Sequence, residues 1–565
     1  MYEKSLTIAK SWLNPPYDKI TQEKVMNLIE GEREELVESF YKELDFGTGG
    51  MRGIMGVGPN RINKYTIGKA TQGLANTLIG LHEGQEVSVA IAYDCRNNSN
   101  KLALNVAEVL TANGIKTYLF NSLRPTPQLS FAVRELGCKG GVVITASHNP
   151  KEYNGFKVYG ADGAQIVSPF DTELINKVRN LSINDVNFNA NKGLMFGLGE
   201  EMDSLYLERL KTLSLSPDYI KKQKDLPIVF TGIHGTGSVI VPKALKAFGF
   251  NNVMTVASQD IIDGNFPTVH SPNPEEPAAL EKAILLAKEK GAELVMGTDP
   301  DADRVGVAIP NPEGEYVLLN GNQTGSLLVN YLMSRWKELG KIKGSEFVAK
   351  TIVTTDLIDT IANANKVKVY NTLTGFKHIG AIIKKLEGKE QFIGGGEESY
   401  GYLAGDFVRD KDAVISCALI AEMVAWAKCS GKTLFNLMEE MYISHGFYLE
   451  DLLSITKHGR LGQEEISKKM SSLRNNPPNR IAGEEVLRVI DYLEPHKTGL
   501  PQSNVLQFVT NKGTKVTARP SGTEPKIKYY FSVQQSLSCA SEYLNVKEVL
   551  VEKIAKIKTE MNLKP

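Results

Sequence analysis

The sequence is short of cysteine, carries no excess of charge of either sign and has no long apolar run. Its 565 residues include five cysteines, scattered and without a CxxC pair. This argues against a disulfide framework or a cysteine zinc site and favours a reducing compartment. The 65 basic and 65 acidic side chains give a formal net charge of +0. That balance argues against nucleic acid as the main partner.

Membrane and export signals are also missing. The longest apolar run, residues 413–427, contains Glu422 and is too short to span a bilayer. We therefore expect a buried helix there. The opening residues, MYEKSLTIAKSW, lack the apolar stretch of a signal peptide. The expectation is a cytoplasmic protein with no membrane partner.

Several common catalytic signatures are absent as well. No Walker A sequence or dinucleotide fingerprint occurs, which disfavours nucleotide hydrolysis and NAD chemistry. The pattern GxSxG is missing around Ser147, which disfavours hydrolases built on a nucleophile elbow.

What is present is a repeated α/β rhythm. Short β-branched runs alternate with helical stretches from about residue 86, and the pattern restarts twice. After residue 445 the sequence becomes polar, then gives several strands and one amphipathic helix. We expect three similar mixed α/β domains followed by a smaller C-terminal α+β domain. The expected segments are a helical extension 1–45 and domains 46–203, 204–313, 314–445 and 446–565.

The segment GTDPDADR carries the strongest chemical signal. Asp299, Asp301 and Asp303 alternate, so an extended loop projects all three carboxylates to one side. Because these charges repel each other, a hard divalent cation is their natural partner. An EF-hand is excluded, since Arg304 and Pro310 stand where glycine and glutamate belong. A solvated acidic turn is the bland alternative.

A sharper alternative for the same segment is the aspartyl nucleophile of haloacid-dehalogenase-like phosphatases, which would be Asp299.

The segment TASHNP also follows a strand and offers Ser147 as a nucleophile or phosphate carrier. Its alternative is a helix N-cap, a position that serine favours. Lys157, in NGFK, can neutralise phosphate or move a proton, although a lone lysine is usually only solvated.

Two further loops have the composition of ligand sites. GGGEESYG offers Glu397 and Ser399 as acceptors for sugar hydroxyls, with a tight turn as the alternative. RPSGTEPK offers Arg519, Ser521 and Thr523, with nearby backbone N–H groups, as a phosphate nest. A proline-glycine turn between strands explains the second loop equally well.

Taken in order, TASHNP, DPDADR, GEESYG and RPSGTEP resemble the four loops of the α-D-phosphohexomutases, the family of phosphoglucomutases and phosphomannomutases. The resemblance runs from about Phe46 onward, and FGTGGMRG and TGFKHI also look like family elements. The long N-terminal extension and GEESYG resemble the branch of bacterial phosphoglucomutases and phosphopentomutase-like enzymes. The resemblance implies four domains around a central active-site cleft.

The resemblance also implies a mechanism. Ser147 would carry a phosphoryl group, and its phosphate oxygen would hold one Mg²⁺ together with Asp299, Asp301 and Asp303. The phosphoserine would pass its phosphate to a sugar monophosphate. The resulting glucose 1,6-bisphosphate, both intermediate and activator, would turn end for end and return the other phosphate to Ser147.

The remaining site residues follow from the same resemblance. Arg52 would lie near the reacting phosphate, Lys157 or His148 would transfer a proton, and Arg304 would steady the metal loop. Lys377 resembles a sugar-facing lysine, although His378 departs from the family pattern. The expected substrate contacts are Thr374, Gly375, Lys377, Glu397, Ser399, Arg519, Ser521, Gly522 and Thr523.

The expected substrates and partners are small sugar phosphates. We expect a phosphoglucomutase that interconverts glucose 1-phosphate and glucose 6-phosphate, with mannose or pentose phosphates as alternatives. Glucose and mannose differ only at C2, so contacts to O3 and O4 do not separate them. A Mg²⁺-dependent aspartyl phosphatase and a catalytically idle sensor are the competing classes. The sequence does not indicate an oligomeric state.

Overall fold

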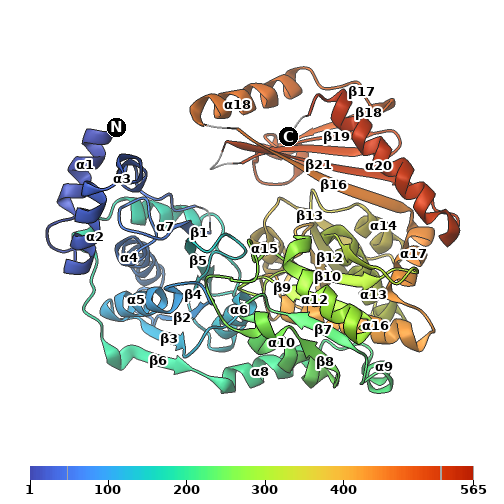
Figure 1. Ribbon diagram of the computed structural model, residues 1–565, viewed down its shortest axis with the longest axis horizontal. Helices are drawn as coiled ribbons and strands as arrows, with labels where there is room; N and C mark the ends of the chain where they lie inside the picture. Colours follow the sequence, from blue (N-terminus) through green and yellow to red (C-terminus); the bar gives the residue numbers. More distant parts are fainter. Residues whose placement is uncertain (48, 458, 522–524, 564–565) are drawn as a thin grey trace. The chain divides into compact units, whose positions relative to one another are not determined.

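The computed structural model describes residues 1–47, 49–457, 459–521 and 525–563 (Figure 1). The chain divides into two compact units. Unit 1 comprises Met1–Leu319, Phe376–Gly388 and Tyr400–Cys429. Unit 2 comprises Asn320–Gly375, Lys389–Ser399 and Ser430–Pro565.

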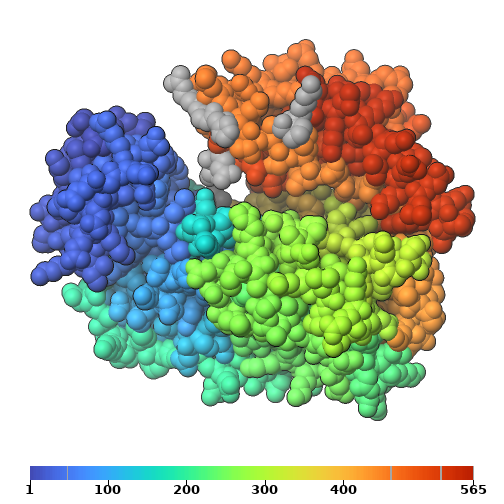
Figure 2. Space-filling model, in the orientation of Figure 1, coloured from blue at the N-terminus to red at the C-terminus, as the bar shows by residue number. Residues whose placement is uncertain are grey.

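Unit 1 opens with three helices, α1 (Tyr2–Ser11), α2 (Lys19–Glu30) and α3 (Arg33–Phe40). Aromatic side chains pack these helices against the following α/β layer. The Trp12 ring contacts the rings of Phe40 and Tyr65 edge-on, with centroid distances of 5.6 and 5.8 Å. Asp18 caps α2 by accepting from the Thr21 N–H and also accepts from the Tyr65 hydroxyl. Figure 2 shows these blue helices continuous with the surface of the first α/β layer.

The first sheet of unit 1 has the order β1-β5-β4-β2-β3-β6. Its strands are β1 (Gly50–Ile54), β2 (Ser88–Tyr93), β3 (Lys116–Phe120), β4 (Gly140–Ile144), β5 (Tyr153–Gly160) and β6 (Met195–Leu198). Strands β2, β3, β4 and β6 are parallel, whereas β5 is antiparallel to both β1 and β4. Its helices are α4 (Lys64–Leu81), α5 (Ser99–Ala112), α6 (Thr126–Glu135) and α7 (Phe170–Arg179), with short turns η1 (Ile183–Asp185) and η2 (Lys192–Leu194).

The second sheet of unit 1 has the order β11-β10-β9-β7-β8. Its strands are β7 (Ile228–Thr231), β8 (Val253–Thr255), β9 (Leu294–Thr298), β10 (Val305–Pro310) and β11 (Tyr316–Leu319). Strands β7, β8 and β9 are parallel, and β9 turns back into β10 as an antiparallel pair. The other elements of unit 1 are α8 (Glu200–Lys211), α9 (Pro217–Lys222), α10 (Gly237–Phe248), α11 (Ala257–Asp260), α12 (Pro277–Lys290), α15 (Phe376–Leu386), β15 (Tyr402–Ala404) and α16 (Ala413–Cys429).

Unit 2 contains a third, parallel sheet in which β12 (Glu346–Thr351) lies between β13 (Lys368–Thr372) and β14 (Gln391–Gly396). Its helices are α13 (Gly321–Glu338), α14 (Leu357–Ala364) and α17 (Leu434–His445). Three α/β layers therefore precede the C-terminal region, as the sequence predicts.

The fourth sheet is antiparallel, with the order β16-β21-β20-β19-β18-β17. Its strands are β16 (Phe447–Thr456), β17 (Arg480–Ile481), β18 (Glu484–Asp491), β19 (Leu506–Thr510), β20 (Lys515–Pro520) and β21 (Lys526–Gln535). The accompanying helices are α18 (Gly459–Asn475), α19 (Pro495–Thr498), η3 (Ala540–Glu542) and α20 (Tyr543–Glu560), and α18 and α20 both contact β21. The predicted C-terminal α+β domain is confirmed.

The apolar run at residue 413 forms the buried helix that the sequence predicts. Nearly every residue of α16 is buried, and Glu422 on it is fully buried as well. Its carboxylate accepts from the Leu215 N–H at 2.9 Å and from the Ser214 hydroxyl, which satisfies the charge inside unit 1. In the described ranges no single helix is long and apolar enough to cross a membrane; α16 and α17 pass together only as a bent pair, by length and composition.

One carboxyl group of unit 2 predicts a pH-dependent stability. Burial raises the pKa of Glu450, on β16, from 4.5 to about 7, and the Ser532 hydroxyl that donates to it opposes the shift only in part. Because the folded state holds this proton more tightly, the stabilisation is present below pH 4.5 and is lost as pH rises through 7. From pH 5 to pH 8, wild type should lose about 1–3 kcal/mol relative to Glu450→Gln. Urea unfolding of both proteins at each pH measures this, with exposed Glu485→Gln as control; parallel pH profiles would contradict it.

Candidate active site

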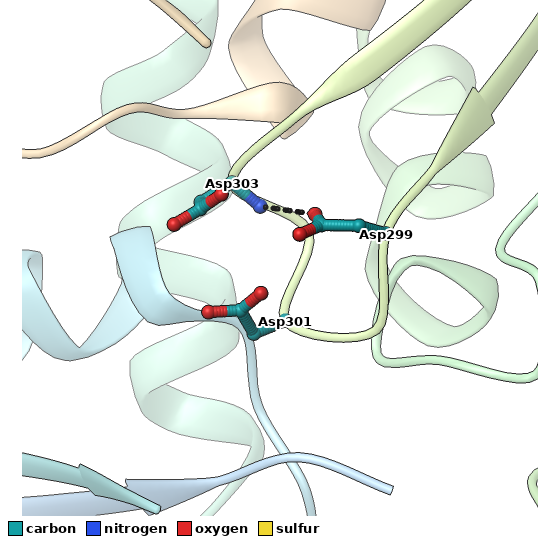
Figure 3. Close-up of side chains that lie close together, drawn as sticks. All are labelled: Asp299, Asp301 and Asp303. Carbon is teal, nitrogen blue, oxygen red and sulfur yellow. Dashed lines mark hydrogen bonds between the residues drawn. The ribbon is translucent and has the colours of Figure 1, made fainter. Parts of the chain in front are cut away.

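The three predicted metal ligands lie in the loop that joins β9 to β10 (Figure 3). Asp299, Asp301 and Asp303 are 0%, 0% and 1% exposed, so the loop is not a solvated acidic turn. One carboxylate oxygen from each lies within 4.8 Å of the others. Hydrogen bonds join the two ends of this loop, because the backbone N–H groups of Asp303 and Arg304 both donate to Asp299 Oδ1 at 3.1 Å.

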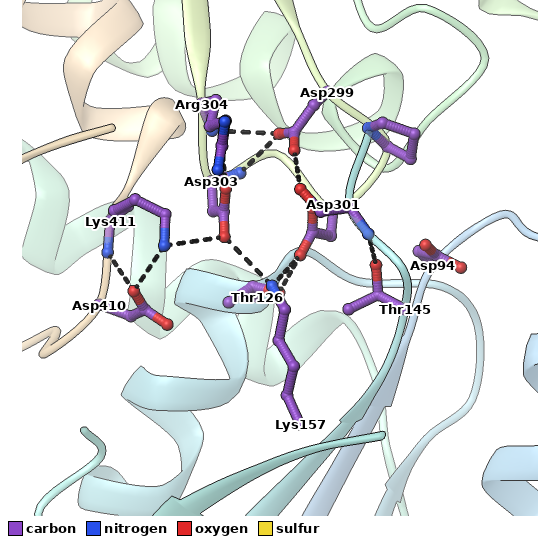
Figure 4. A network of polar contacts seen from close by, with 12 residues as sticks. Asp94, Thr126, Thr145, Lys157, Asp299, Asp301, Asp303, Arg304, Asp410 and Lys411 are labelled. Carbon is purple, nitrogen blue, oxygen red and sulfur yellow. Dashed lines mark hydrogen bonds and ion pairs between the residues drawn. The ribbon is translucent and has the colours of Figure 1, made fainter. Parts of the chain in front are cut away.

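Two lysines balance much of the negative charge of this triad (Figure 4). Lys157 Nζ lies 2.7 Å from Asp301 Oδ2 and 3.2 Å from Asp303 Oδ2, and Lys411 Nζ lies 3.2 Å from the same Asp303 oxygen. Burial alone would raise the pKa of Asp301, but the Lys157 ammonium outweighs it and lowers that pKa. For Asp299, burial and the two neighbouring carboxylates outweigh the Arg304 charge and the Ser147 hydrogen bond, and they raise its pKa well above the usual range.

The serine loop begins where β4 ends and reaches directly into the triad. Ser147 is 3% exposed, and its hydroxyl donates to Asp299 Oδ2 at 2.7 Å. The Ser147 N–H donates to Thr145 Oγ1 at 2.8 Å. No helix begins at this serine, because the chain passes through a turn into β5. The helix N-cap alternative is therefore wrong.

The serine loop and the neighbouring strands β1 and β5 place three basic side chains in this region of unit 1: His148, Arg52 and Lys157. His148 Nδ1 lies 3.2 Å from Ser147 Oγ, and burial together with the Arg304 and Arg52 charges holds the pKa of His148 well below its usual value. Arg52, on β1, is exposed and donates from Nη1 to Asn149 Oδ1 at 2.9 Å. Lys157 is placed by the register of β1 with β5, which pairs it with Gly50.

Arg304 contacts both the aspartate loop and a neighbouring segment. Its Nη1 donates to Glu275 Oε1 at 2.6 Å, and its Nε lies 3.8 Å from Asp303 Oδ1. The guanidinium thus joins the last carboxylate of the triad to a neighbouring segment of unit 1. The unit brings together eight predicted residues: Arg52, Ser147, His148, Lys157, Asp299, Asp301, Asp303 and Arg304.

Sequence reasoning missed two residues that touch the triad. Thr126, at the start of α6, grips Asp301 twice: its hydroxyl donates to Oδ2 at 2.7 Å and its N–H donates to the carbonyl at 2.9 Å. Lys411 follows the GGGEESYG loop by ten residues, and the neighbouring Asp410 also accepts a hydrogen bond from its ammonium group at 3.1 Å. The available signals were the strand-end position of RPTPQ and the charged run RDKD, but neither has a distinctive residue pattern.

The predicted substrate contacts of unit 2 lie at the ends of strands. Glu397, just after β14, is buried, and its Oε1 accepts from the Gly375 N–H at 2.9 Å; Thr374 and Ser399 nearby in sequence are half-buried. Arg519, on β20, donates to the Tyr530 hydroxyl at 3.5 Å. The predicted residues Gly522 and Thr523 lie outside the described residues.

The RPSGTEP loop closes through a backbone hydrogen bond in which the Ser521 N–H donates to the Lys526 carbonyl at 2.7 Å. Lys377 differs from the other predicted sugar contacts because it lies, with His378, in the first turn of α15, which belongs to unit 1. Burial lowers the pKa of both, that of His378 to about 4.

Comparison with known families matches three successive segments of the chain. The phosphoglucomutase/phosphomannomutase α/β/α domains I, II and III match residues 43–184, 204–314 and 320–444. Curated relatives agree. The phosphoglucomutase of Staphylococcus haemolyticus is 40% identical over 511 residues, covering 88% of this chain and 91% of the relative, and that of Staphylococcus aureus USA300 is 38% identical over the same shares.

Solved structures share the fold at low identity. The phosphoglucomutase parafusin of Paramecium, in its open form, has a TM-score of 0.69 at 16% identity, covering 92% of this chain and 96% of its own. A phosphoglucomutase/phosphomannomutase family protein of Burkholderia thailandensis has a TM-score of 0.66 at 18% identity, covering 91% and 97%. The chain therefore belongs to the phosphoglucomutase/phosphomannomutase family, whose members are isomerases that move a phosphoryl group.

Proposed function

We propose that this protein is a phosphoglucomutase that interconverts glucose 1-phosphate and glucose 6-phosphate through a phosphoserine at Ser147. The observation that carries the proposal is the 2.7 Å contact between Ser147 Oγ and Asp299 of a fully buried carboxylate triad. The curated phosphoglucomutases at 38–40% identity support glucose phosphate as the substrate. Turnover of glucose 1-phosphate, compared with mannose 1-phosphate and ribose 1-phosphate, tests it.

The triad fits a single Mg²⁺. Two of its buried oxygens, Asp301 Oδ1 and Asp303 Oδ1, have no hydrogen-bond partner among the described residues, and an all-carboxylate oxygen set suits a hard cation. Asp299, Asp301 and Asp303 would hold the ion together with an oxygen of the Ser147 phosphate. Bound there, Mg²⁺ withdraws charge from the phosphoryl group in transit.

The chain's own residues divide the remaining work. In the forward transfer the bond between Ser147 Oγ and phosphorus breaks, a sugar hydroxyl oxygen bonds to phosphorus, and the proton of that hydroxyl is passed on to the released Ser147 Oγ. His148 is suited to accept this proton, because its lowered pKa keeps the imidazole neutral near pH 7. Lys157 is suited to neutralising phosphate instead, since Asp301 and Asp303 outweigh its burial and raise its pKa.

The bisphosphate must then rebind with its two phosphates exchanged. A phosphate site away from the serine serves both orientations, and the RPSGTEP loop with Arg519 is our candidate for it. Glu397, held by the Gly375 N–H, and half-buried Ser399 would accept from ring hydroxyls in both poses. Thr374, Lys377, Ser521, Gly522 and Thr523 complete the proposed substrate contacts, and glucose 1,6-bisphosphate is the proposed intermediate and activator.

Arg519→Ala should weaken the binding of glucose 1-phosphate by about tenfold or more, because one charge-assisted contact is worth roughly 1.5–3 kcal/mol. The same variant should release more glucose 1,6-bisphosphate per turnover, and added bisphosphate should restore part of the rate. Titration calorimetry and assay of the released intermediate measure both effects. Arg488→Ala, which removes an exposed arginine from β18 of the same sheet, is the matched control. Unchanged affinity and retention in Arg519→Ala would make the loop a simple turn.

Two organisational predictions complete the proposal. We propose domain boundaries at residues 45/46, 203/204, 313/314 and 445/446, which limited proteolysis with mass mapping tests. We also propose a cytoplasmic location, which cell fractionation tests.

A Mg²⁺-dependent aspartyl phosphatase is the alternative function that would replace the mutase. Phosphate trapped on Asp299 instead of Ser147 would establish it.

A further inference from the structure

The serine loop is held in an unusual backbone conformation. Ser147 has φ of 51°, in the left-handed region that is strained for a residue with a Cβ. Such a conformation persists only where surrounding contacts impose it. Within the loop between β4 and β5 the Ser147 N–H donates to Thr145 Oγ1 and the Asn149 N–H donates to the Ala146 carbonyl, and further contacts come from elsewhere in unit 1.

One buried arginine supplies them. Arg96, in the loop between β2 and α5, donates from Nη2 to the carbonyl of Ser147 at 2.6 Å and to that of Asn149. Its Nη1 donates to the carbonyls of Pro150 at 2.8 Å and Tyr153 at 3.0 Å. Four acceptors within seven residues thus converge on one guanidinium.

Arg96 is itself fixed from behind. Its side chain is 0% exposed, and its Nε lies 3.4 Å from Asp94 Oδ2, which is equally buried. Asp94 Oδ1 accepts from the Arg96 N–H at 2.9 Å and from the Ser99 hydroxyl at 2.8 Å, which anchors the carboxylate at the start of α5. The guanidinium also lies over the Phe266 ring, 5.2 Å from its centroid.

We infer that Arg96 is a positioning residue that shapes the serine loop and so aims Ser147 Oγ at Asp299. The inference rests on the proposed function of Ser147 and extends it to a residue that touches no reacting atom. Arginine is required because its planar guanidinium group carries five N–H donors that point in different directions. A lysine ammonium has three N–H donors on a single nitrogen and cannot reach four separated carbonyls. The Asp94 carboxylate orients the fork.

Arg96→Lys tests this inference because it keeps the charge and removes the fork. We expect kcat to fall about 100-fold with KM for glucose 1-phosphate nearly unchanged, since a displacement near 1 Å of a reacting group costs that much. Amide hydrogen exchange should accelerate in residues 145–153 and not in β2 or β3. Arg134→Lys is the matched control, because Arg134 also donates to a loop carbonyl, that of Asp162, but outside the serine loop.

A second variant covers the case in which Arg96→Lys does not fold. Asp94→Asn keeps an acceptor at Oδ1 and removes the charge beside Nε, so we expect a smaller fall in kcat, about threefold to tenfold, again with KM unchanged. Wild-type kcat in Arg96→Lys, or in Asp94→Asn where the lysine variant is unfolded, would overturn the inference while leaving the proposed function intact. A wild-type protein without mutase activity would instead refute the proposed function and this inference with it.

Discussion

Ser147→Ala should lower kcat for glucose 1-phosphate by roughly 10⁴-fold or more, because it removes the atom that carries the phosphoryl group. Intact-mass analysis of the wild-type protein should show a species heavier by one phosphate, and this species should be missing from the variant. The fold should tolerate the change, since alanine fits the space of serine and the hydroxyl bonds to Asp299 and His148 lie within the site itself.

Ser204→Ala is the control for this variant, because its hydroxyl donates to a helix carbonyl on α8 and an alanine fits the same helix. It should keep full activity. Residual turnover in Ser147→Ala is compatible with a substitute acceptor, which added glucose 1,6-bisphosphate would reveal as a bisphosphate-dependent rate. Full activity together with an unmodified wild-type mass would reject the mutase.

Asp301→Asn should abolish turnover that depends on Mg²⁺ and weaken metal binding measured by calorimetry. The variant loses one buried anionic ligand and also leaves Lys157 with a single carboxylate, Asp303. The Thr126 hydroxyl can still donate to the amide oxygen, so the loop should keep its place.

Chelation provides an independent readout for the same site. Excess chelator should stop the wild-type enzyme, and Mg²⁺ should restore it. Asp218→Asn, which changes an exposed aspartate in the first turn of α9, should behave as wild type in both assays. Full wild-type activity in chelator, with no bound metal, would reject the metal site.

The α/β layers were predictable because their strands are short, β-branched and separated by helical periodicity. The antiparallel placement of β5 against β4 was not, because strand direction depends on the length of the connection, and a strand of either direction has the same composition. The buried helix α16 was predictable from its apolar run. Its partner atoms at Ser214 and Leu215 were not, since nothing in the local sequence indicates which loop meets Glu422.

The chemistry-bearing loops were predictable for a similar reason. The alternating aspartates of the Asp299 loop could be singled out from residue type and spacing. Ser147 could not be singled out alone, because a serine after a strand also suits a helix N-cap, and the resemblance of the four loops taken in order favoured it. Arg96 and Thr126 could not, because both act on backbone atoms as well as side chains, and such contacts leave no pattern in the sequence. Buried arginines and threonines at strand ends are common in structural roles.

The proposed catalytic centre also sets how the gene could be recombined with those of its relatives. Ser147 and Thr126 come from the first sheet region, whereas their partners Asp299 and Asp301 come from the second. A crossover between residues 203 and 204 would unite a serine loop and a metal loop that had diverged separately. Such chimaeras should be active only when the Thr126–Asp301 and Ser147–Asp299 contacts are both inherited intact. Productive crossovers should therefore lie before the first sheet or after the second, so that both sheets come from one parent.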